Sequence, residues 1–319
     1  MTAETTSGLF GDLAVDVEFD APIGRDSWFC AGGTADLLLH PHDPAALAEI
    51  VRRCRRQDVP LRILGEGANL LVDDAGVDGV VVRLDRPAFR ALERNADGDV
   101  ELVRVGAGAD LAKTLMELAR SGLAGLEALM GVPASIGGAI RMNAGGAFGS
   151  IGDAVHAVAC LDAQGEDRLY PASELRFDYR RTNIVDPIVT SAIFRVTPAD
   201  PVGLRARIKE IAAYKKSTQP LADKSAGCMF RNPTDPETGE RISAGRIIDE
   251  CGLKGLRLGS AVVSPVHANF ITIDRGGFAR DAIHLGDEII RRVRDARGLE
   301  LRREVVVWRR DQTPESSAP

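Results

Sequence analysis

The sequence lacks the features that identify several common classes of protein. No apolar run in its 319 residues approaches the roughly 20 residues that a membrane-spanning helix needs. The formal net charge is −6, so the basic surplus typical of general nucleic-acid-binding proteins is absent. The first residues are polar and acidic and show no signal-peptide pattern. We therefore expect a cytoplasmic protein with neither a nucleic-acid nor a membrane partner.

Cysteine is scarce and scattered. The five cysteines are odd in number and include no Cys-x-x-Cys pair, which argues against both a disulfide framework and a zinc site and is typical of a cytoplasmic protein with reduced thiols. Cys54, Cys160 and Cys251 lie in apolar patterns and are expected in or near the core. Cys228 differs because it follows Gly227 in a loop rich in glycine and proline, and composition alone leaves its role open.

Motifs for metals and nucleotides are incomplete. His40 and His42 form the only close histidine pair, and they are better explained as surface residues at a strand end than as ligands, so we expect no metal. The stretch GAGADL at 106–111 follows a strand and opens a helix, as a Rossmann fingerprint does, but Leu111 occupies the third glycine position. We therefore expect an ordinary turn there. GEGANL at 65–70 fails the same test, and no Walker pattern occurs.

What the sequence does contain is a nearly uncharged stretch of small residues at 125–149, GLEALMGVPASIGGAIRMNAGGAFG. Only Glu127 and Arg141 in it are ionisable. Glycine lets backbone N–H groups approach a ligand, and such groups bind phosphate, so the stretch predicts a site for a pyrophosphate-bearing cofactor. A tightly packed Gly/Ala turn is the alternative. Two glycine-rich turns, this one and 65–70, without a Rossmann or Walker pattern favour a flavin fold of another type.

Short strands alternate with helices, which predicts an α/β or α+β fold. The length favours two domains, and Asp200-Pro201 suggests a boundary near residue 199, which gives domains at 20–198 and 199–310. The first twenty and last nine residues read as loose ends. Helices are expected to begin after Asp43, Asp110 and Ser243, to surround 204–211, and to run from Arg280 to Arg297.

Two charged segments have no clear role from spacing alone. YRRTN at 179–183 reads as a solvated strand end. In ELRREVVVW, strand alternation would place Arg302, Glu304 and Val306 on one face. A carboxylate beside three valines is either a solvent-facing residue or an acid with a tuned pKa, and spacing favours the former.

Taken together and in order, six segments resemble motifs of the UDP-N-acetylenolpyruvoylglucosamine reductase family, flavoenzymes of peptidoglycan precursor synthesis. The resemblance runs from about Gly24 to Val307. The segments are AGGTADLLL, LGEGANLLV, GLEALMGVPASIGGAIRMNAG, YRRT, QPLADKSAGCMFRNP and AGRIIDECGLKGLRLGSAVVSPVHANFI.

The resemblance implies an α+β fold: an FAD-binding domain of the vanillyl-alcohol-oxidase (PCMH) type in two subdomains, then a smaller substrate-binding domain. It implies that NADPH reduces FAD and is replaced by UDP-N-acetylglucosamine enolpyruvate, which is reduced to UDP-N-acetylmuramate. Hydride goes to C3 of the enolpyruvyl group, and an acid protonates C2. We expect a monomer, and noncovalent FAD because the 131–149 stretch holds no histidine that could tether a flavin.

The resemblance also assigns residues. It places Arg180, Cys228 and Glu304 as catalytic, and Tyr179 and Asn232 as substrate-binding. The cofactor-binding residues it implies are Gly65, Gly67, Ala68, Asn69, Leu70, Gly131, Pro133, Ser135, Ile136, Gly137, Gly138 and Asn143.

The implied chemistry is physically coherent. Arg180 can fork onto the carboxylate that gains charge as hydride arrives at C3. Glu304 would either donate a hydrogen bond there as a neutral acid or orient Arg180, and the sequence leaves both open. Two rival functions remain from the residues: another flavin oxidoreductase of the same fold acting on a hydroxy acid or alcohol, and a non-catalytic flavin- or UDP-sugar-binding protein.

This chain departs from the family pattern at the proton donor, where Cys228 replaces a serine. A free thiol has a pKa of about 8.5, which Arg180 would lower and apolar walls would raise, so we expect activity to fall on the alkaline side with a thiol-like pKa. The other departures are Ala68 and Lys224, and Thr182 and Arg231, which keep the hydroxyl and the charge of the usual residues.

Overall fold

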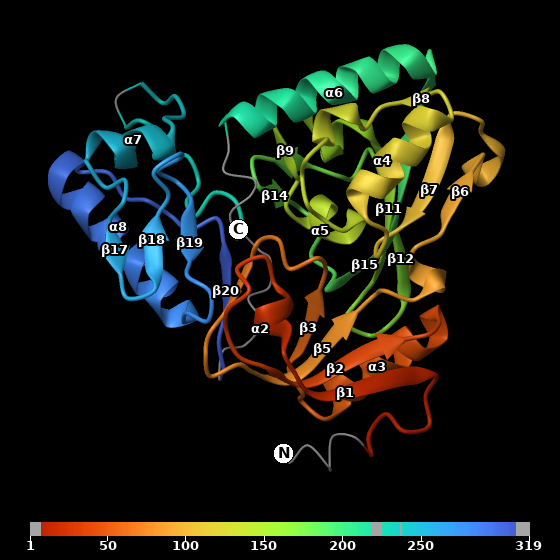
Figure 1. Ribbon diagram of the computed structural model, residues 1–319. Coiled ribbons are helices and arrows are strands. Elements are labelled where there is room, and N and C mark those ends of the chain that lie inside the picture. The colour runs from red at the N-terminus through yellow and green to blue at the C-terminus, as the bar shows by residue number, and fades with distance from the viewer. Residues whose placement is uncertain (1–7, 219–224, 237, 311–319) are drawn as a thin grey trace.

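The computed structural model describes residues 8–218, 225–236 and 238–310. The predicted loose end at 311–319 and the departure at Lys224 lie outside the described residues. The chain forms two units side by side, and Figure 1 shows the C-terminal unit, drawn in blue, next to the larger one. No helix in the described ranges has the length and apolar character needed to cross a membrane.

The first sheet of the larger unit has the order β1-β2-β5-β3. Strand β1 runs antiparallel to β2, and the β2–β5 and β5–β3 pairs are parallel. The strands are β1 (Val15–Ala21), β2 (Ala35–Pro41), β3 (Leu61–Leu64) and β5 (Val77–Arg83). The crossover from β2 to β3 is α3 (Pro44–Arg56), which begins as predicted, with Asp43 accepting a hydrogen bond from the Ala46 N–H at 2.8 Å.

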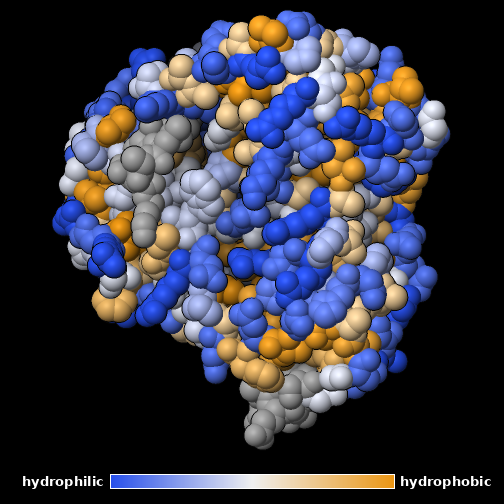
Figure 2. Space-filling model, turned by 45° about the vertical axis from the view of Figure 1, so that its right-hand side comes forward, coloured by the Kyte–Doolittle hydropathy of each residue, from blue (hydrophilic) through white to orange (hydrophobic). Residues whose placement is uncertain are grey.

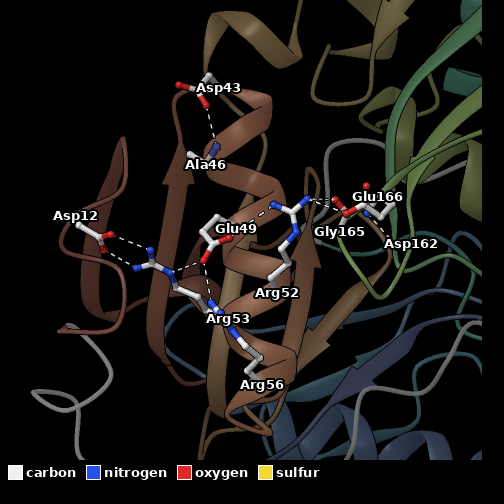
Figure 3. Close-up of polar contacts among 10 residues, drawn as sticks. All are labelled: Asp12, Asp43, Ala46, Glu49, Arg52, Arg53, Arg56, Asp162, Gly165 and Glu166. Atoms are coloured by element: carbon white, nitrogen blue, oxygen red, sulfur yellow. Dashed lines mark hydrogen bonds and ion pairs between the residues drawn. The ribbon is translucent and has the colours of Figure 1, made fainter.

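The prediction that the first twenty residues are loose was wrong for residues 8–20. Phe10 is fully buried, and β1 pairs along its length with β2. Arg53 on α3 holds the segment by an ion pair with Asp12 (Figure 3). It also donates a 2.7 Å hydrogen bond to the Leu9 carbonyl. These contacts are long-range, so polar composition alone did not reveal them.

Helix α3 also reaches the second sheet. Its Arg52 donates to the Gly165 carbonyl at 2.9 Å and to Glu166 at 3.1 Å, in the turn that follows strand β11 (Val155–Leu161) of that sheet (Figure 3). Glu49 pairs with Arg53 and Arg56 on the same helix. One helix therefore contacts the N-terminal segment on one side and the neighbouring sheet on the other.

The second sheet is antiparallel throughout, with the order β12-β11-β15-β7-β6. Its strands are β6 (Leu92–Arg94), β7 (Leu102–Gly106), β11 (Val155–Leu161), β12 (Asp167–Pro171) and β15 (Ile188–Arg195). The helices beside it are α4 (Leu111–Arg120), capped by Asp110 as predicted, and α5 (Ile136–Arg141). Short elements complete the unit: α2 (Ile23–Asp26), β4 (Leu70–Val72), β8 (Leu123–Ala124), β9 (Gly145–Gly146), β10 (Gly149–Ser150), β13 (Phe177–Asp178), β14 (Arg181–Thr182) and β16 (Thr197–Pro198).

The packing of helix α6 bears on where the two units meet in the chain. Helix α6 (Pro201–Thr218) lies along the top of the larger unit in Figure 1. Its Leu204 and Ile208 are buried in the same apolar core as the second sheet, and the helix packs against α4 and the short helical turn at Glu127–Leu129. The physical unit therefore extends through α6, and the C-terminal unit begins after it.

The C-terminal unit is a small α+β layer. The sheet has the order β17-β18-β19 and is antiparallel, with α8 packed on it. Its elements are α7 (Ala244–Glu250), β17 (Arg257–Leu258), β18 (Ala261–Val263), β19 (Ile271–Ile273) and α8 (Ala279–Arg297). Ser243 caps α7, and α8 ends at Gly298 with a φ of 66°, both as predicted.

The two units are joined by the last strand. β20 (Val306–Trp308) leaves the C-terminal unit and pairs parallel with β4 of the larger unit. Figure 1 shows β20 between the two. The residues just before it, including Glu304, are thereby carried to the junction between the units.

Candidate functional site

A cavity of about 320 Å³ lies where the glycine-rich turns meet. Backbone hydrogen bonds join the turn after β7 to the start of α5: Gly137 N–H to the Ala107 carbonyl at 2.8 Å, and Ile136 N–H to the Ala109 carbonyl at 2.9 Å. The GAGADL turn is thus part of the cavity wall, although its sequence predicted an ordinary turn. The lining residues are Asp26, Ile63, Leu64, Gly65, Glu66, Arg83, Leu84, Asp85, Arg90, Ala107, Gly108, Ser135, Gly137, Gly138, Arg141, Pro187 and Val189.

Glycine is required here because neighbouring chain segments come very close together. A Cβ added to Gly108 would lie 1.5 Å from the Leu84 carbonyl oxygen, and one added to Gly65 would lie 2.6 Å from the Ser135 Oγ. Ser135 caps α5 by accepting from the Gly138 N–H at 3.3 Å. From the sequence, the glycines could serve either close packing or access of a ligand to the backbone. In the structure the closely packed turns themselves line the cavity.

The cavity wall suits an anionic, extended ligand. Three arginines line it: Arg83, Arg90 and Arg141. Arg141 is anchored by the carbonyls of Ile184, at 2.8 Å, and of Asp186. Burial lowers the pKa of Arg141, but a guanidinium remains charged. The carboxylates of Asp26, Glu66 and Asp85 also line the cavity, so the positive charge is local to the arginines, beside bare glycine backbone. These are the features that a dinucleotide diphosphate needs.

The predicted cofactor residues separate into two groups. Gly65, Ser135, Gly137 and Gly138 line the cavity. The remaining ones, which do not line it, are Gly67, Ala68, Asn69, Leu70, Gly131, Pro133, Ile136 and Asn143. Among them, Asn69 and Asn143 form hydrogen bonds to the segments that carry Glu304 and Arg180, and Ile136 is fully buried in the core.

A second group of residues lies at the junction of the units, around Arg180. Arg180 has a φ of 57°, a left-handed conformation, in the turn between β13 and β14. Its Nε donates to Glu304 Oε1, and its Nη1 donates to the Gly145 carbonyl at 3.1 Å. Asn143 supports the turn by donating to the Asp178 carbonyl at 2.9 Å. The strained turn thus brings an arginine from the larger unit onto a carboxylate from the C-terminal segment.

Glu304 is buried, so the expectation of a solvent-facing carboxylate was wrong. The residue lies before β20 rather than within it, and strand alternation does not apply. Its N–H donates to the Met229 carbonyl at 2.8 Å, and its own carbonyl accepts from Asn69 Nδ2 at 3.0 Å. Burial raises the pKa of Glu304, while Arg180 and Arg231 oppose that rise.

Arg180 and Glu304 form a coupled pair. Burial alone would lower the pKa of Arg180, but the Glu304 carboxylate outweighs it and the net direction is upward. The guanidinium therefore stays charged, and Glu304 contacts its Nε edge. This geometry favours the orienting role for Glu304 over the neutral-donor role.

Cys228 lies near Arg180 and Glu304, at the junction of the units. Burial raises the pKa of its thiol to about 12, the nearby Glu304 adds to the rise, and Arg180 lowers it. The expectation of a thiol-like alkaline pKa is therefore wrong, because desolvation of the thiolate outweighs the attraction of Arg180. At neutral pH this cysteine is a protonated thiol.

Tyr179 and Asn232 connect the two units. The Asn232 N–H donates to the Tyr179 hydroxyl at 3.3 Å, and Asn232 Oδ1 accepts from the Ala244 N–H at 3.0 Å, at the start of α7. The Tyr179 ring is flanked by Arg180, at 5.3 Å, and by Arg241, at 4.2 Å from ring centre to guanidinium carbon. Arg241, a residue that the sequence analysis did not single out, adds a further positive charge to this junction.

Sequence reasoning also missed Lys215. This α6 residue is buried, and its Cδ would be 3.1 Å from a Cβ added to Gly131. Burial lowers its pKa, and so does the charge of Arg180. Within the described ranges no carboxylate forms an ion pair with it. A buried lysine in an amphipathic helix pattern gives no signal of this kind until the fold places it near Arg180.

Among the residues that the structure describes, no group of three or more histidine, cysteine or acidic residues could hold a metal ion. His42 is partly exposed beside Asp16, at 3.1 Å. His40 was expected at the surface but is buried, 2.9 Å from Asp85 and 3.2 Å from Glu18.

Figure 2 shows one face of the molecule, on which hydrophilic residues predominate and hydrophobic ones lie in smaller groups between them. This agrees with 40 basic and 46 acidic residues in the sequence. The basic residues at the junction range from the buried Lys215 through the half-buried Arg180 to the exposed Arg241, and they belong to a protein without a general excess of positive charge.

Comparison with known proteins agrees with this architecture. The model for an FAD binding domain matches residues 35–167, and the model for the C-terminal domain of UDP-N-acetylenolpyruvoylglucosamine reductase matches residues 219–308. UDP-N-acetylenolpyruvoylglucosamine reductase of Desulfosudis oleivorans is 36% identical over 300 residues, which cover 91% of this chain and 94% of the relative. The enzyme of the same name from Syntrophus aciditrophicus is 38% identical over 291 residues and 91% of each chain.

A solved structure extends the match to three dimensions. The crystal structure of UDP-N-acetylenolpyruvylglucosamine reductase from Thermus caldophilus has a TM-score of 0.76 and 36% identity, and it covers 92% of this chain and 99% of that one. The predicted fold class, a vanillyl-alcohol-oxidase-type FAD-binding domain followed by a smaller α+β domain, is confirmed.

Proposed function

The chain belongs to the UDP-N-acetylenolpyruvoylglucosamine reductase family, and from that premise we propose how its residues carry out the family reaction. The protein is an FAD-dependent oxidoreductase that uses NADPH to reduce UDP-N-acetylglucosamine enolpyruvate to UDP-N-acetylmuramate in peptidoglycan precursor synthesis. Both rival functions from the sequence are set aside, because the relatives that share about nine-tenths of the chain carry this one name. The monomeric state and the cytoplasmic location remain proposals, and the five free thiols support a reducing location.

FAD fits the residues that surround the cavity. The glycine turns present backbone at Gly65, Gly137 and Gly138, Ser135 adds a hydroxyl, and Arg141 adds charge. When bound, the flavin supplies the hydride that is transferred to C3 of the substrate. We assign the unit from residue 8 through α6 to FAD binding and the C-terminal unit to substrate binding, which moves the proposed boundary from residue 199 to the end of α6.

Arg180 is proposed to bind the substrate carboxylate. Hydride addition at C3 pushes charge through C2 onto that carboxylate, and a guanidinium held in place beforehand stabilises the charge without reorganising. Glu304 orients Arg180 by accepting from Nε, and the Gly145 carbonyl restricts Nη1. Lys215, buried near Arg180, would add positive charge on the same side.

Cys228 is proposed to donate the proton to C2. The S–H bond breaks, its electron pair stays on sulfur, and the new C–H bond restores the carboxylate from its enolate-like form. The observation that carries the assignment is the meeting of Cys228, Arg180 and Glu304 at the junction of the units, where the thiol can supply the proton, Arg180 the countercharge and Glu304 its orientation.

An anaerobic experiment tests the function. NADPH is added to the purified protein until the flavin absorbance is bleached, and UDP-N-acetylglucosamine enolpyruvate is then added. We expect the absorbance to return with one equivalent of substrate and UDP-N-acetylmuramate to form. A flavin that stays reduced with this substrate would contradict the assignment.

FAD is expected to be noncovalent. No histidine or cysteine is among the cavity-lining residues in the described ranges, so no side chain of the kind that tethers flavins is in place. Acid precipitation should leave yellow flavin in the supernatant, measured by its absorbance. Flavin that stays with the protein pellet would show a covalent link and contradict this prediction.

The pH dependence follows from the pKa of Cys228. The donor form is the neutral thiol, so activity is lost only as pH rises through a pKa of about 12, and the rate of flavin reoxidation by substrate should be flat from about pH 7 to about pH 9. Reduction of the flavin by NADPH, followed at the same pH values, is the control. A fall in reoxidation with a midpoint near the ordinary thiol value would show that Arg180 dominates instead.

A further inference from the structure

The backbone next to Cys228 is fixed by one buried side chain, Asn269. Its Oδ1 accepts from the Phe230 N–H at 2.9 Å, and its Nδ2 donates to the Phe230 carbonyl at 2.8 Å. Its backbone carbonyl also accepts from the Met229 N–H at 2.7 Å. Asn269 is only 2% exposed, so no water competes for these bonds. Three hydrogen bonds therefore hold the two residues that follow the proton donor.

The same short segment is bonded to Glu304 on its other side. The Met229 carbonyl accepts from the Glu304 N–H at 2.8 Å, and Phe230 forms an antiparallel bridge with Arg303. The Cys228–Phe230 segment thus lies between Asn269 and the Glu304 segment and is hydrogen-bonded to both. A change at Asn269 would alter the position of Cys228 relative to the Arg180–Glu304 pair.

The Asn269 amide has one donor left for Cys228. A carboxamide nitrogen carries two N–H groups, and the Phe230 carbonyl takes one. A hydrogen bond from the Asn269 side chain lowers the pKa of Cys228, although burial and Glu304 outweigh it. Such a bond is stronger to a thiolate than to a thiol, because the acceptor is then charged.

We propose that Asn269 is a positioning residue for the proton donor: its carboxamide fixes the backbone beside Cys228 and directs its second N–H at the sulfur. When the S–H proton moves to C2 of the substrate, the electron pair left on sulfur gains this hydrogen bond, and solvent later returns a proton to the thiolate. The proposal rests on the assignment of Cys228 as donor. Asn269 is not among the residues to which the family resemblance assigned a catalytic or binding role.

The test compares the two half-reactions of Asn269→Ala. Flavin reduction by NADPH needs no proton donor and should stay within about twofold of wild type, whereas reoxidation by UDP-N-acetylglucosamine enolpyruvate should slow by about 10-fold or more, the usual cost of a lost hydrogen bond to a charged group. Ser264→Ala is the matched control, because Ser264 is equally buried in the same loop and accepts from the Val266 N–H at 3.2 Å. It should leave both half-reactions unchanged.

A double-mutant cycle separates positioning from a general structural role. If Asn269 acts through Cys228, then Asn269→Ala should slow reoxidation no further once Cys228→Ala is present. Equal slowing of both half-reactions, or additive effects in the double variant, would overturn the proposal. If Asn269→Ala fails to bind FAD, Asn269→Asp is measured in the same way, since it keeps the acceptor for the Phe230 N–H but has no N–H for sulfur. Wild-type reoxidation in Cys228→Ala would instead overturn the donor assignment itself.

Discussion

Cys228→Ala is expected to accept electrons from NADPH at the wild-type rate and then to stop with reduced flavin in the presence of substrate. Hydride addition at C3 places charge on C2 and the carboxylate, and the thiol is the acid next to Arg180 and Glu304. Positioned general acids contribute about 10²–10⁴-fold, so reoxidation should slow by that amount. Stopped-flow absorbance of the flavin, under nitrogen, measures both half-reactions separately.

Cys228→Ser provides the control for this prediction. Serine restores the residue usual in the family and keeps a donor of similar size in the same place, so it should reoxidise the flavin where alanine does not. Alkylation of the wild type at Cys228 should imitate alanine, although it will be slow, because a pKa of about 12 leaves roughly one thiol in 10⁴ ionised at pH 8. Reoxidation of Cys228→Ala at the wild-type rate would exclude Cys228 as the donor.

Arg180→Lys is expected to bind FAD normally and to lose about 10²-fold or more in turnover, the usual effect of removing a group that stabilises transition-state charge. Arg180 does not line the FAD cavity, so the flavin content should be unchanged. Lysine keeps the charge but has neither the Nε that donates to Glu304 nor the forked geometry that matches a carboxylate. Steady-state kcat and flavin content measure the two effects.

Arg181→Lys is the matched control for that variant. Arg181 is the next residue in the chain, is exposed and opens β14. It makes no contact with Glu304 in the described structure, so its replacement should leave kcat near wild type. A near-wild-type kcat for Arg180→Lys would remove the forked contact from the mechanism, and equal losses in both variants would indicate a disturbed turn.

The local signals in the sequence were sufficient for many individual elements. Asp43, Asp110 and Ser243 cap helices because their side chains accept backbone N–H groups one turn on, and this interaction needs no tertiary contact. Gly298 ends α8 because the left-handed conformation there costs glycine little. The glycine-rich stretch at 125–149 indicated close backbone approach for the same reason.

The sequence alone also pointed to the reaction, through the order of its motifs. What it could not decide was how residues far apart in the chain meet. Spacing placed Glu304 toward solvent, but β20 crosses to pair with β4 and carries Glu304 into a buried contact with Arg180. From the sequence, a pKa close to that of a free thiol was expected for Cys228, but burial at the junction of the units raises it.

Lys215 and Arg241 lie outside the six segments that resembled the family and Asn269 lies within one of them, but no local pattern gave any of the three a role, because charge and hydrogen-bonding groups gain their roles from their neighbours in space. Helix caps and glycine turns depend on a few consecutive residues, so the sequence by itself determined them. The ionisation of Cys228 and Glu304 depends on desolvation and on groups distant in the chain, and the ion pair that orients Arg180 joins residues 124 positions apart. Only the tertiary structure brings those groups together and excludes water from them, and it therefore decided the chemistry of the site.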